Sequence, residues 1–122
     1  MADPPLKKII ARFYRTEAGN MPVRDWLLDL SERDRKIVGG DIADVEFGWP
    51  VGMPVCRPLS GGDLREVRST IRDGHVEARV IFGIDGDQMI LLHGFEKKPS
   101  QQDKEIETGR HRWVDYKRRK GK

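Results

Sequence analysis

The sequence contains a single cysteine, Cys56, so it cannot form an internal disulfide. A small scaffold held together by disulfides is therefore excluded, and a reducing compartment is favoured. No apolar run approaches the roughly 18 residues that a membrane-spanning helix needs, and residues 1–6 lack the apolar core of a signal peptide. We therefore expect a cytoplasmic protein that does not contact a membrane.

Motifs for metal and nucleotide binding are also missing. The three histidines are scattered, and the carboxylates do not cluster at a recognisable metal-ligand spacing. The phosphate-binding pattern GxxxxGK followed by Ser or Thr is absent, and so are paired-cysteine fingers. We therefore expect no metal ion and no cofactor, so that any catalysis depends on side chains alone.

Positive charge is what the sequence has in excess. Charged residues make up 35% of the chain, the formal net charge is +3 and the isoelectric point is about 9.2. This balance mildly favours a polyanionic partner such as nucleic acid. A length of 122 residues suits one core, so we expect a single domain over 1–122 with a basic C-terminal tail at about 117–122.

The first half of the chain predicts one strand and two helices. Residues 8–14 form a β-prone run that ends in a glycine-containing turn. Apolar side chains at helical spacing predict a short helix over 23–30, and Ser31 can cap a second helix that continues toward Phe47. The following segment, 48–62, is rich in glycine and proline and predicts a loop without regular structure.

The second half predicts a three-stranded antiparallel meander and a last helix. The turns Asp73-Gly74 and Asp85-Gly86 are strong hairpin signals between β-prone runs. The expected elements are strands at 64–71, 76–84 and 88–95 and a helix at 103–118. The order β-α-α-β-β-β-α predicts an α+β fold with helices covering one face of a mostly antiparallel sheet. The other face would be free for a ligand.

Strand alternation places two arginines on that free face. If Val67 and Val80 face the helices, then Arg68 and Arg79 face the opposite way and become neighbours across a hairpin. Two guanidinium groups on an uncovered face are suited to holding a phosphate through bidentate hydrogen bonds. Surface ion pairs with nearby glutamates are the alternative. On an exposed face, removing Arg79 would cost chemistry more than stability.

Lys97 and Lys98 form a second cationic cluster at the end of the last strand. Adjacent ammonium groups repel each other, so one could release its proton and act as a general base while the other stays charged. Two solvated surface lysines are the alternative. His93 can exchange protons near neutral pH, although a lone strand histidine is more often packed and hydrogen-bonded. The alternation also predicts that Met89, Leu91 and His93 share one side of their strand.

Four short motifs occur together in this half of the chain. They are Glu-Val-Arg at 66–68, Arg79-Val-Ile-Phe, Leu-Leu-His-Gly-Phe-x-Lys-Lys at 91–98, and Glu-Ile-Glu leading to Asp115-Tyr116. In this order and spacing the sequence resembles the phage-derived HigB-like toxins of the RelE/ParE superfamily, which belong to type II toxin-antitoxin systems. The first half agrees with that family in element order. The resemblance implies a RelE-like fold.

The same resemblance implies a metal-independent endoribonuclease that cleaves mRNA on the ribosome. Its partners would be mRNA, the ribosome and a HigA-like helix-turn-helix antitoxin that silences it. By motif position, the catalytic candidates are Arg68, Arg79, Lys97, Lys98 and His93. Basic and aromatic residues outside this group are expected to contact RNA, namely Arg65, Arg110, Arg112, Tyr116 and Lys117.

The sequence departs from the family at two positions that matter for catalysis. Glu66 stands where the RelE branch tends to carry a base-like lysine, and no tyrosine follows Pro99. The general acid is therefore unassigned, with His93, Tyr116 and Lys97 as candidates. An alternative function is a non-catalytic RelE-fold binding module or co-repressor that keeps the basic surface. Direct DNA binding is a weaker alternative, because no recognition helix is predicted.

Overall fold

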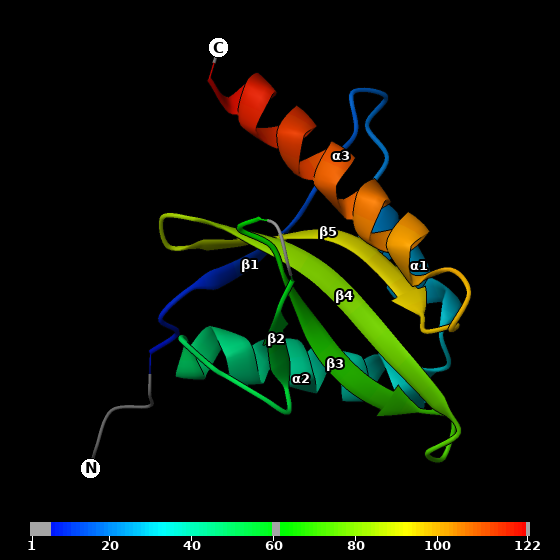
Figure 1. The fold of residues 1–122 in the computed structure, drawn as a ribbon. Helices are drawn as coiled ribbons and strands as arrows, with labels where there is room; N and C mark the ends of the chain where they lie inside the picture. Colours follow the sequence, from blue (N-terminus) through cyan, green and yellow to red (C-terminus); the bar gives the residue numbers. More distant parts are fainter. Residues whose placement is uncertain (1–5, 60–61, 122) are drawn as a thin grey trace.

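The computed structural model describes residues 6–59 and 62–121 (Figure 1). Its elements are β1 (Ile10–Phe13), α1 (Pro22–Asp29), α2 (Glu32–Gly48), β2 (Cys56–Pro58), β3 (Arg65–Ile71), β4 (Val76–Asp85), β5 (Gln88–Glu96) and α3 (Gln102–Lys120). The predicted α+β class is confirmed, and all seven predicted elements are present. The predicted basic tail continues α3 as far as Lys120, and Lys122 lies outside the described residues.

The strands form one five-stranded sheet in the order β1-β5-β4-β3-β2. β1 pairs with β5 in parallel, whereas every other neighbouring pair is antiparallel. The expected meander of β3, β4 and β5 is therefore confirmed. In the first hairpin turn, Arg72, Asp73 and Gly74 have φ values of 50°, 54° and 90°. Gly86 has φ 62° in the second turn, a conformation that glycine adopts without strain.

The prediction that 48–62 has no regular structure is wrong for Cys56–Pro58. These residues form β2, which pairs antiparallel with the start of β3. A proline is tolerated at this position because β2 is an edge strand, where a missing N–H costs no ladder hydrogen bond. The short strand also places Cys56 in the core and leaves Arg57 exposed.

One face of the sheet packs against α1 and α2. Ser31 caps α2 as predicted, because its Oγ accepts a hydrogen bond of 3.1 Å from the Asp34 backbone N–H. Below the two helices lies an apolar core that includes Val23, Val38, Ile42, Val45, Val67, Val80 and Phe82. Burial of this core stabilises α2 despite its two internal glycines.

The opposite face is half covered by α3, so the prediction of a fully free face is wrong (Figure 1). The helix lies over β4 and β5 because glycines allow it to approach closely. A Cβ on Gly109 would come 2.9 Å from Ile81 Cγ2, and a Cβ on Gly83 would come 2.7 Å from Trp113. The remaining half of this face, formed by β3 and β2, carries no helix (Figure 1).

A β-bulge changes which β5 side chains share a face. Ile81 pairs with His93 and Phe82 pairs with Leu91, so Leu92 is the extra residue. Met89 and Leu91 therefore face α1 and α2, whereas His93 faces α3. The predicted grouping of Met89, Leu91 and His93 on one side is wrong for this reason. None of the described helices is long and apolar enough to cross a membrane.

Candidate active site

Arg68 and Arg79 are direct neighbours on the face of the sheet opposite α2. They are Cα partners in the β3–β4 register, as the alternation predicted. Val67 and Val80, which flank this pair in the same register, point into the α1/α2 core. The two arginines therefore lie at the end of the face that α3 leaves uncovered.

The side chain of Arg79 is buried, which corrects the expectation of an exposed arginine. Its exposed fraction is 1%, and Glu66 beside it has an exposed fraction of 0%. Arg79 Nη1 donates to Glu77 Oε2 at 3.0 Å and to the Ala78 carbonyl at 3.0 Å, and Arg79 Nε lies 3.6 Å from Glu66 Oε1. Two carboxylates thus compensate one guanidinium that has lost its water. A buried arginine requires such partners.

Glu77 connects this buried pair to the exposed surface. Its carboxylate accepts from Arg79, and Thr70 Oγ1 donates to it at 3.4 Å. The hydrogen bond from Arg79 is the main reason that the pKa of Glu77 lies below its usual value. Arg68 is half-buried and lines a pocket of about 390 Å³ with Thr70 and Glu77. Its Nη1 contacts Met53 Sδ at 3.6 Å.

Lys97 and Lys98 lie at the same end of the sheet as the arginines. The Lys97 backbone N–H donates to the Glu77 carbonyl at 2.7 Å, which extends the β4–β5 ladder by one residue. Both lysine side chains are exposed. The four cationic residues selected from the sequence therefore belong to the same end of the β3–β5 hairpins, with Glu66 and Glu77 on the neighbouring strand positions.

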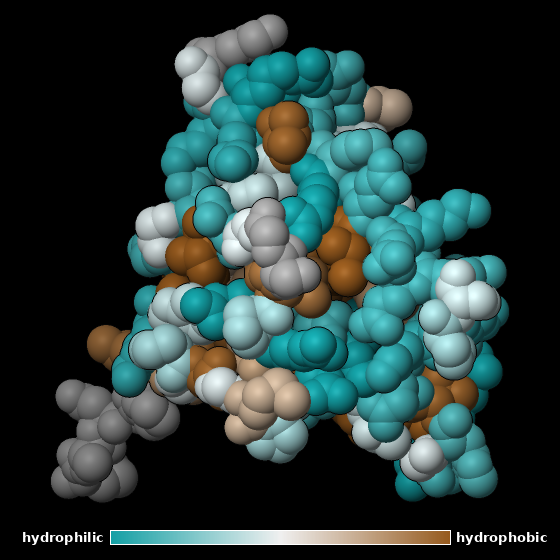
Figure 2. Space-filling model, viewed as in Figure 1, coloured by the Kyte–Doolittle hydropathy of each residue, from teal (hydrophilic) through white to brown (hydrophobic). Residues whose placement is uncertain are grey.

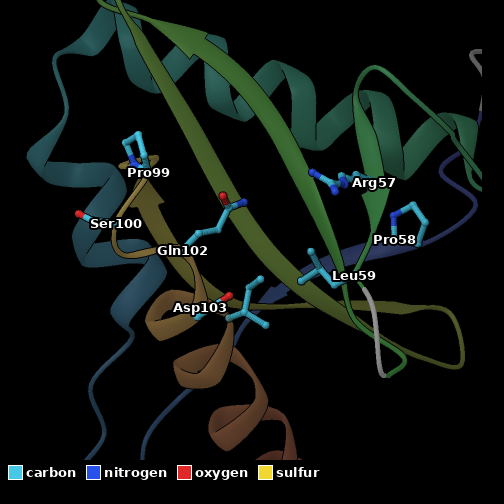
Figure 3. Close-up of a pocket in the computed structure, with 8 residues that line it drawn as sticks. Arg57, Pro58, Leu59, Pro99, Ser100, Gln102 and Asp103 are labelled. Carbon is cyan, nitrogen blue, oxygen red and sulfur yellow. The ribbon is translucent and has the colours of Figure 1, made fainter.

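A pocket of about 550 Å³ adjoins this cluster (Figure 3). It lies between β2 and the beginning of α3, next to the chain segment that follows Lys98. Polar side chains reach into it from both sides, whereas its walls are partly apolar (Figure 3). The lining residues are Arg57, Pro58, Leu59, Pro99, Ser100, Gln102, Asp103 and Ile106.

His93 lies beneath α3 rather than in a pocket. Its Nδ1 is 3.0 Å from Arg112 Nη1 and its Nε2 is 3.3 Å from Glu105 Oε2. The guanidinium can only donate, so Nδ1 is the acceptor and the ring proton is on Nε2. Burial is the main cause that lowers the pKa of His93. The neutral ring therefore joins β5 to α3, and no contact joins it to Arg68 or Arg79 among the described residues.

Three of the residues expected to contact RNA lie in different surroundings. Arg65 is on the α1/α2 side of β3, where its guanidinium lies 5.1 Å from the centre of the Trp49 ring. Arg112 donates to the Leu92 carbonyl at 2.9 Å and is half-buried. Arg110 lines a separate pocket beside Gly62. These three arginines therefore do not form one surface with Arg68.

Tyr116 and Lys117 lie near the other end of β4. The Tyr116 hydroxyl donates to Asp85 Oδ2 at 2.5 Å, and burial together with this bond raises the pKa of Tyr116 to about 12. Lys117 is exposed and lies 5.4 Å from the centre of the Trp113 ring. Asp85 lies six positions along β4 from Arg79, or roughly 20 Å away. Tyr116 is therefore far from the arginine cluster and packs the end of α3.

Sequence reasoning missed Arg57, Gln102 and Asp103 as site residues. Arg57 lay in the segment expected to be a loop, Asp103 was considered only as the start of the predicted helix at 103–118, and Gln102 lay just before that helix. Glu66 was noted as a departure from the family pattern, but its role as the partner of Arg79 depends on the β3–β4 pairing. Alternation along the strand places Glu66 and Arg68 on one face, and Arg79 was expected on that face too. This is the signal that could have indicated the ion pair between Glu66 and Arg79.

The arrangement combines fixed positive charge with an adjoining pocket. Arg68 can stabilise negative charge on a phosphate, whereas the buried Arg79 is already paired with Glu66 and Glu77. The exposed lysines can transfer protons. This face of the protein is mainly hydrophilic, with apolar side chains in separate small patches (Figure 2). Among the described residues, no three His, Cys, Asp or Glu side chains are grouped as metal ligands.

Comparison with known families matches most of the chain to one family model. The model for Phage derived protein Gp49-like (DUF891) matches residues 25–114, roughly three quarters of the sequence. This range contains α2, all strands from β2 to β5 and the pocket-lining residues. No curated protein matches the chain.

Proposed function

Since the chain belongs to the Gp49-like family of phage-derived proteins, a RelE/ParE-like toxin family of type II toxin-antitoxin systems, we propose that it is a toxin that cleaves RNA. The proposed activity is metal-independent endonucleolytic cleavage of mRNA on the ribosome. The family implies an antitoxin partner. We further propose that this antitoxin is a HigA-like helix-turn-helix protein and that both act in the cytoplasm.

The pairing of Arg68 with Arg79 beside a pocket is the observation that carries this proposal. RNA cleavage without a metal requires the 2′-hydroxyl to lose its proton and attack phosphorus. The 5′-oxygen must then leave with a proton, which yields a 2′,3′-cyclic phosphate and a 5′-hydroxyl. The charge that builds on the phosphate oxygens needs fixed cations within hydrogen-bond reach.

We assign phosphate binding to Arg68, because its guanidinium lines an open pocket. Arg79 is buried and held by Glu66 and Glu77, so we assign it the positioning of its register partner Arg68 rather than direct contact with the phosphate. Lys97 and Lys98 are exposed at the same end and are the candidates for proton transfer. His93 remains a weaker candidate, because its ring is enclosed between β5 and α3, 3.0 Å from Arg112 and 3.3 Å from Glu105.

The burial of Arg79 favours one alternative function. A guanidinium neutralised by two carboxylates also fits a non-catalytic RelE-fold module or co-repressor, because such a module needs no free arginine at this position and keeps the other basic residues for binding. Such a module would bind RNA or an antitoxin without turnover. Detection of RNA cleavage separates the two functions.

The test is controlled expression of the full chain, with growth measured and mRNA ends mapped with and without translation. The toxin is expected to arrest growth and to produce new mRNA ends only where ribosomes translate. Co-expression of the adjacent helix-turn-helix protein should restore growth. Arrest without new RNA ends would contradict the ribonuclease function, and failure of any neighbouring protein to restore growth would contradict the toxin-antitoxin assignment.

A further inference from the structure

The pocket beside the arginine cluster has free polar side chains of defined hydrogen-bonding capacity. Arg57 extends into it from β2, and Gln102 and Asp103 extend into it from the start of α3 (Figure 3). Among the described residues, these three side chains have no hydrogen-bond or ion-pair partner. Unpaired donors and acceptors around a pocket are the usual means by which a protein selects one ligand.

The pocket adjoins the position proposed for the scissile phosphate. Arg57 is the Cα partner of Glu66 in the β2–β3 register, and Glu66 contacts Arg79 at 3.6 Å. On the other side, Pro99 and Ser100 follow Lys98 directly along the chain. A nucleotide whose phosphate lies on the cationic cluster can therefore place its base between β2 and α3.

The dimensions and walls of the pocket suit a flat, unstacked base. A volume of about 550 Å³ lies within the usual range for small-molecule sites. Leu59 and Ile106 provide apolar surface, and the Arg57 guanidinium provides a planar group on which a base can stack. Proteins that recognise single-stranded RNA read splayed bases in this way, by stacking and by contacts to the Watson–Crick edge.

The polar groups distinguish between the four bases. The Asp103 carboxylate offers two adjacent acceptors, and guanine is the base whose Watson–Crick edge has two adjacent donors, N1–H and N2–H. Gln102 or Arg57 can then donate to guanine O6. Adenine and cytosine each offer one donor group on that edge. Uracil offers one donor, N3–H, between two carbonyl oxygens that the carboxylate repels.

We propose that this pocket binds a guanine base adjacent to the cleaved phosphate and that Asp103 is its specificity-determining residue. The proposal rests on the proposed RNA-cleaving function and adds base selectivity to it. It assigns the pairing of N1–H and N2–H to the carboxylate, and the contact with O6 to Gln102 or Arg57. Asp103→Asn keeps the size of the side chain but replaces one acceptor by a donor, so it should abolish the pairing.

The first experiment measures binding without catalysis. Guanosine, adenosine, cytidine and uridine 3′-monophosphates are titrated into the purified full chain and followed by calorimetry. Guanosine monophosphate should bind tightest, and Asp103→Asn should weaken it about tenfold or more while changing the others less. Glu107→Gln neutralises another exposed acid of α3 outside the pocket and should leave the order unchanged. Equal binding of all four nucleotides would overturn the proposal.

The second experiment maps cleavage sites in translated mRNAs for the wild type, Asp103→Asn and Glu107→Gln. Guanine should be enriched beside the cut for the wild type and the control, and the enrichment should disappear in Asp103→Asn although cutting continues. Cleavage without any guanine preference would overturn the pocket assignment and leave the proposed function intact. Selective, Asp103-dependent binding of guanosine monophosphate without any RNA cleavage would overturn the proposed function and leave the pocket assignment intact.

Discussion

The two faces of the sheet are built from the same strands but contain different chemistry. Below α1 and α2, the β4 side chains Val80 and Phe82 lie in a continuous apolar core. On the other face, the same strand contributes Ile81 where α3 covers it and Arg79 where α3 does not. Charged side chains are thus buried beside the apolar cluster that lies under α3, near the beginning of that helix.

This difference indicates which face of the sheet mainly stabilises the fold and which face contains the candidate site. The α1/α2 face gains most of its stability from apolar burial, although it also buries the α2 carboxylates Asp34 and Glu46. The α3 face includes a buried ion pair, which is weak evidence for stability because desolvation offsets the attraction between the charges. A costly pair next to an open pocket is therefore a candidate for function.

The largest expected effects come from truncating one β4 residue on each face. Phe82→Ala should destabilise the fold by about 3–5 kcal/mol through loss of apolar contacts. Arg79→Ala should also cost about 3–5 kcal/mol, because Glu66 would remain buried without its partner. Urea unfolding measures both. A nearly unchanged stability for Arg79→Ala, as expected of an exposed arginine, would show that the ion pair does not form in solution.

Replacing the whole ion pair should have a different effect from breaking it. The double variant Glu66→Leu with Arg79→Met should be neutral or about 1–4 kcal/mol more stable than the wild type, because no charge is left without a partner. Its RNA cleavage should nevertheless be lost. Unfolding and end mapping on the same preparation test this separation. A double variant that is stable and still cleaves RNA normally would remove Arg79 from the site.

Matched glycine substitutions compare the helices on the two faces. Gly109→Ala should destabilise the chain by about 1–3 kcal/mol, because the new Cβ would come 2.9 Å from Ile81 Cγ2. Gly39→Ala in α2 meets nothing within 4 Å and should stabilise the fold by about 0.5–1 kcal/mol. Thermal unfolding distinguishes the two signs. Equal effects would mean that α3 does not pack closely on β4.

The smallest effect is a pH dependence from His93. Burial holds the pKa of His93 below its ordinary 6.5, so the unfolded chain binds this proton more readily than the folded chain. The stability contributed by the neutral ring is therefore present above pH 6.5 and lost as the pH falls below it. Between about pH 7.5 and about pH 5.5, the free energy of unfolding should fall less in His93→Gln than in the wild type. His111→Gln, at an exposed histidine, is the control and should retain the wild-type slope.

Local signals in the sequence predicted most of the fold. The Asp-Gly turns, the Ser31 cap and the alternation of Val67 with Arg68 act over a few residues, so they can be read without knowing the tertiary structure. The three-residue strand β2 and the bulge at Leu92 could not be read this way. Both depend on hydrogen bonds to a neighbouring strand, and the bulge moved His93 to the face opposite Leu91.

The candidate site was predicted less completely for the same reason. The sequence placed Arg68 and Arg79 side by side, which the strand register confirms. It did not indicate that Arg79 is buried, because its surroundings include Glu66 from the adjacent strand, and the pairing of strands is not visible in the sequence. Nor could it bring Arg57 and Asp103 to one pocket, since 46 positions of chain separate them.

The rate of mRNA cleavage by Arg68→Ala in a purified translation system tests the central claim most directly. Arg24→Ala, an exposed arginine on α1, is the matched control. If the uncovered half of the α3 face is the active site, Arg68→Ala should cleave about 10²–10³-fold more slowly at a stability within about 1 kcal/mol of wild type, whereas the control should cleave normally. Equal rates for Arg68→Ala and the wild type would contradict the assignment of this site.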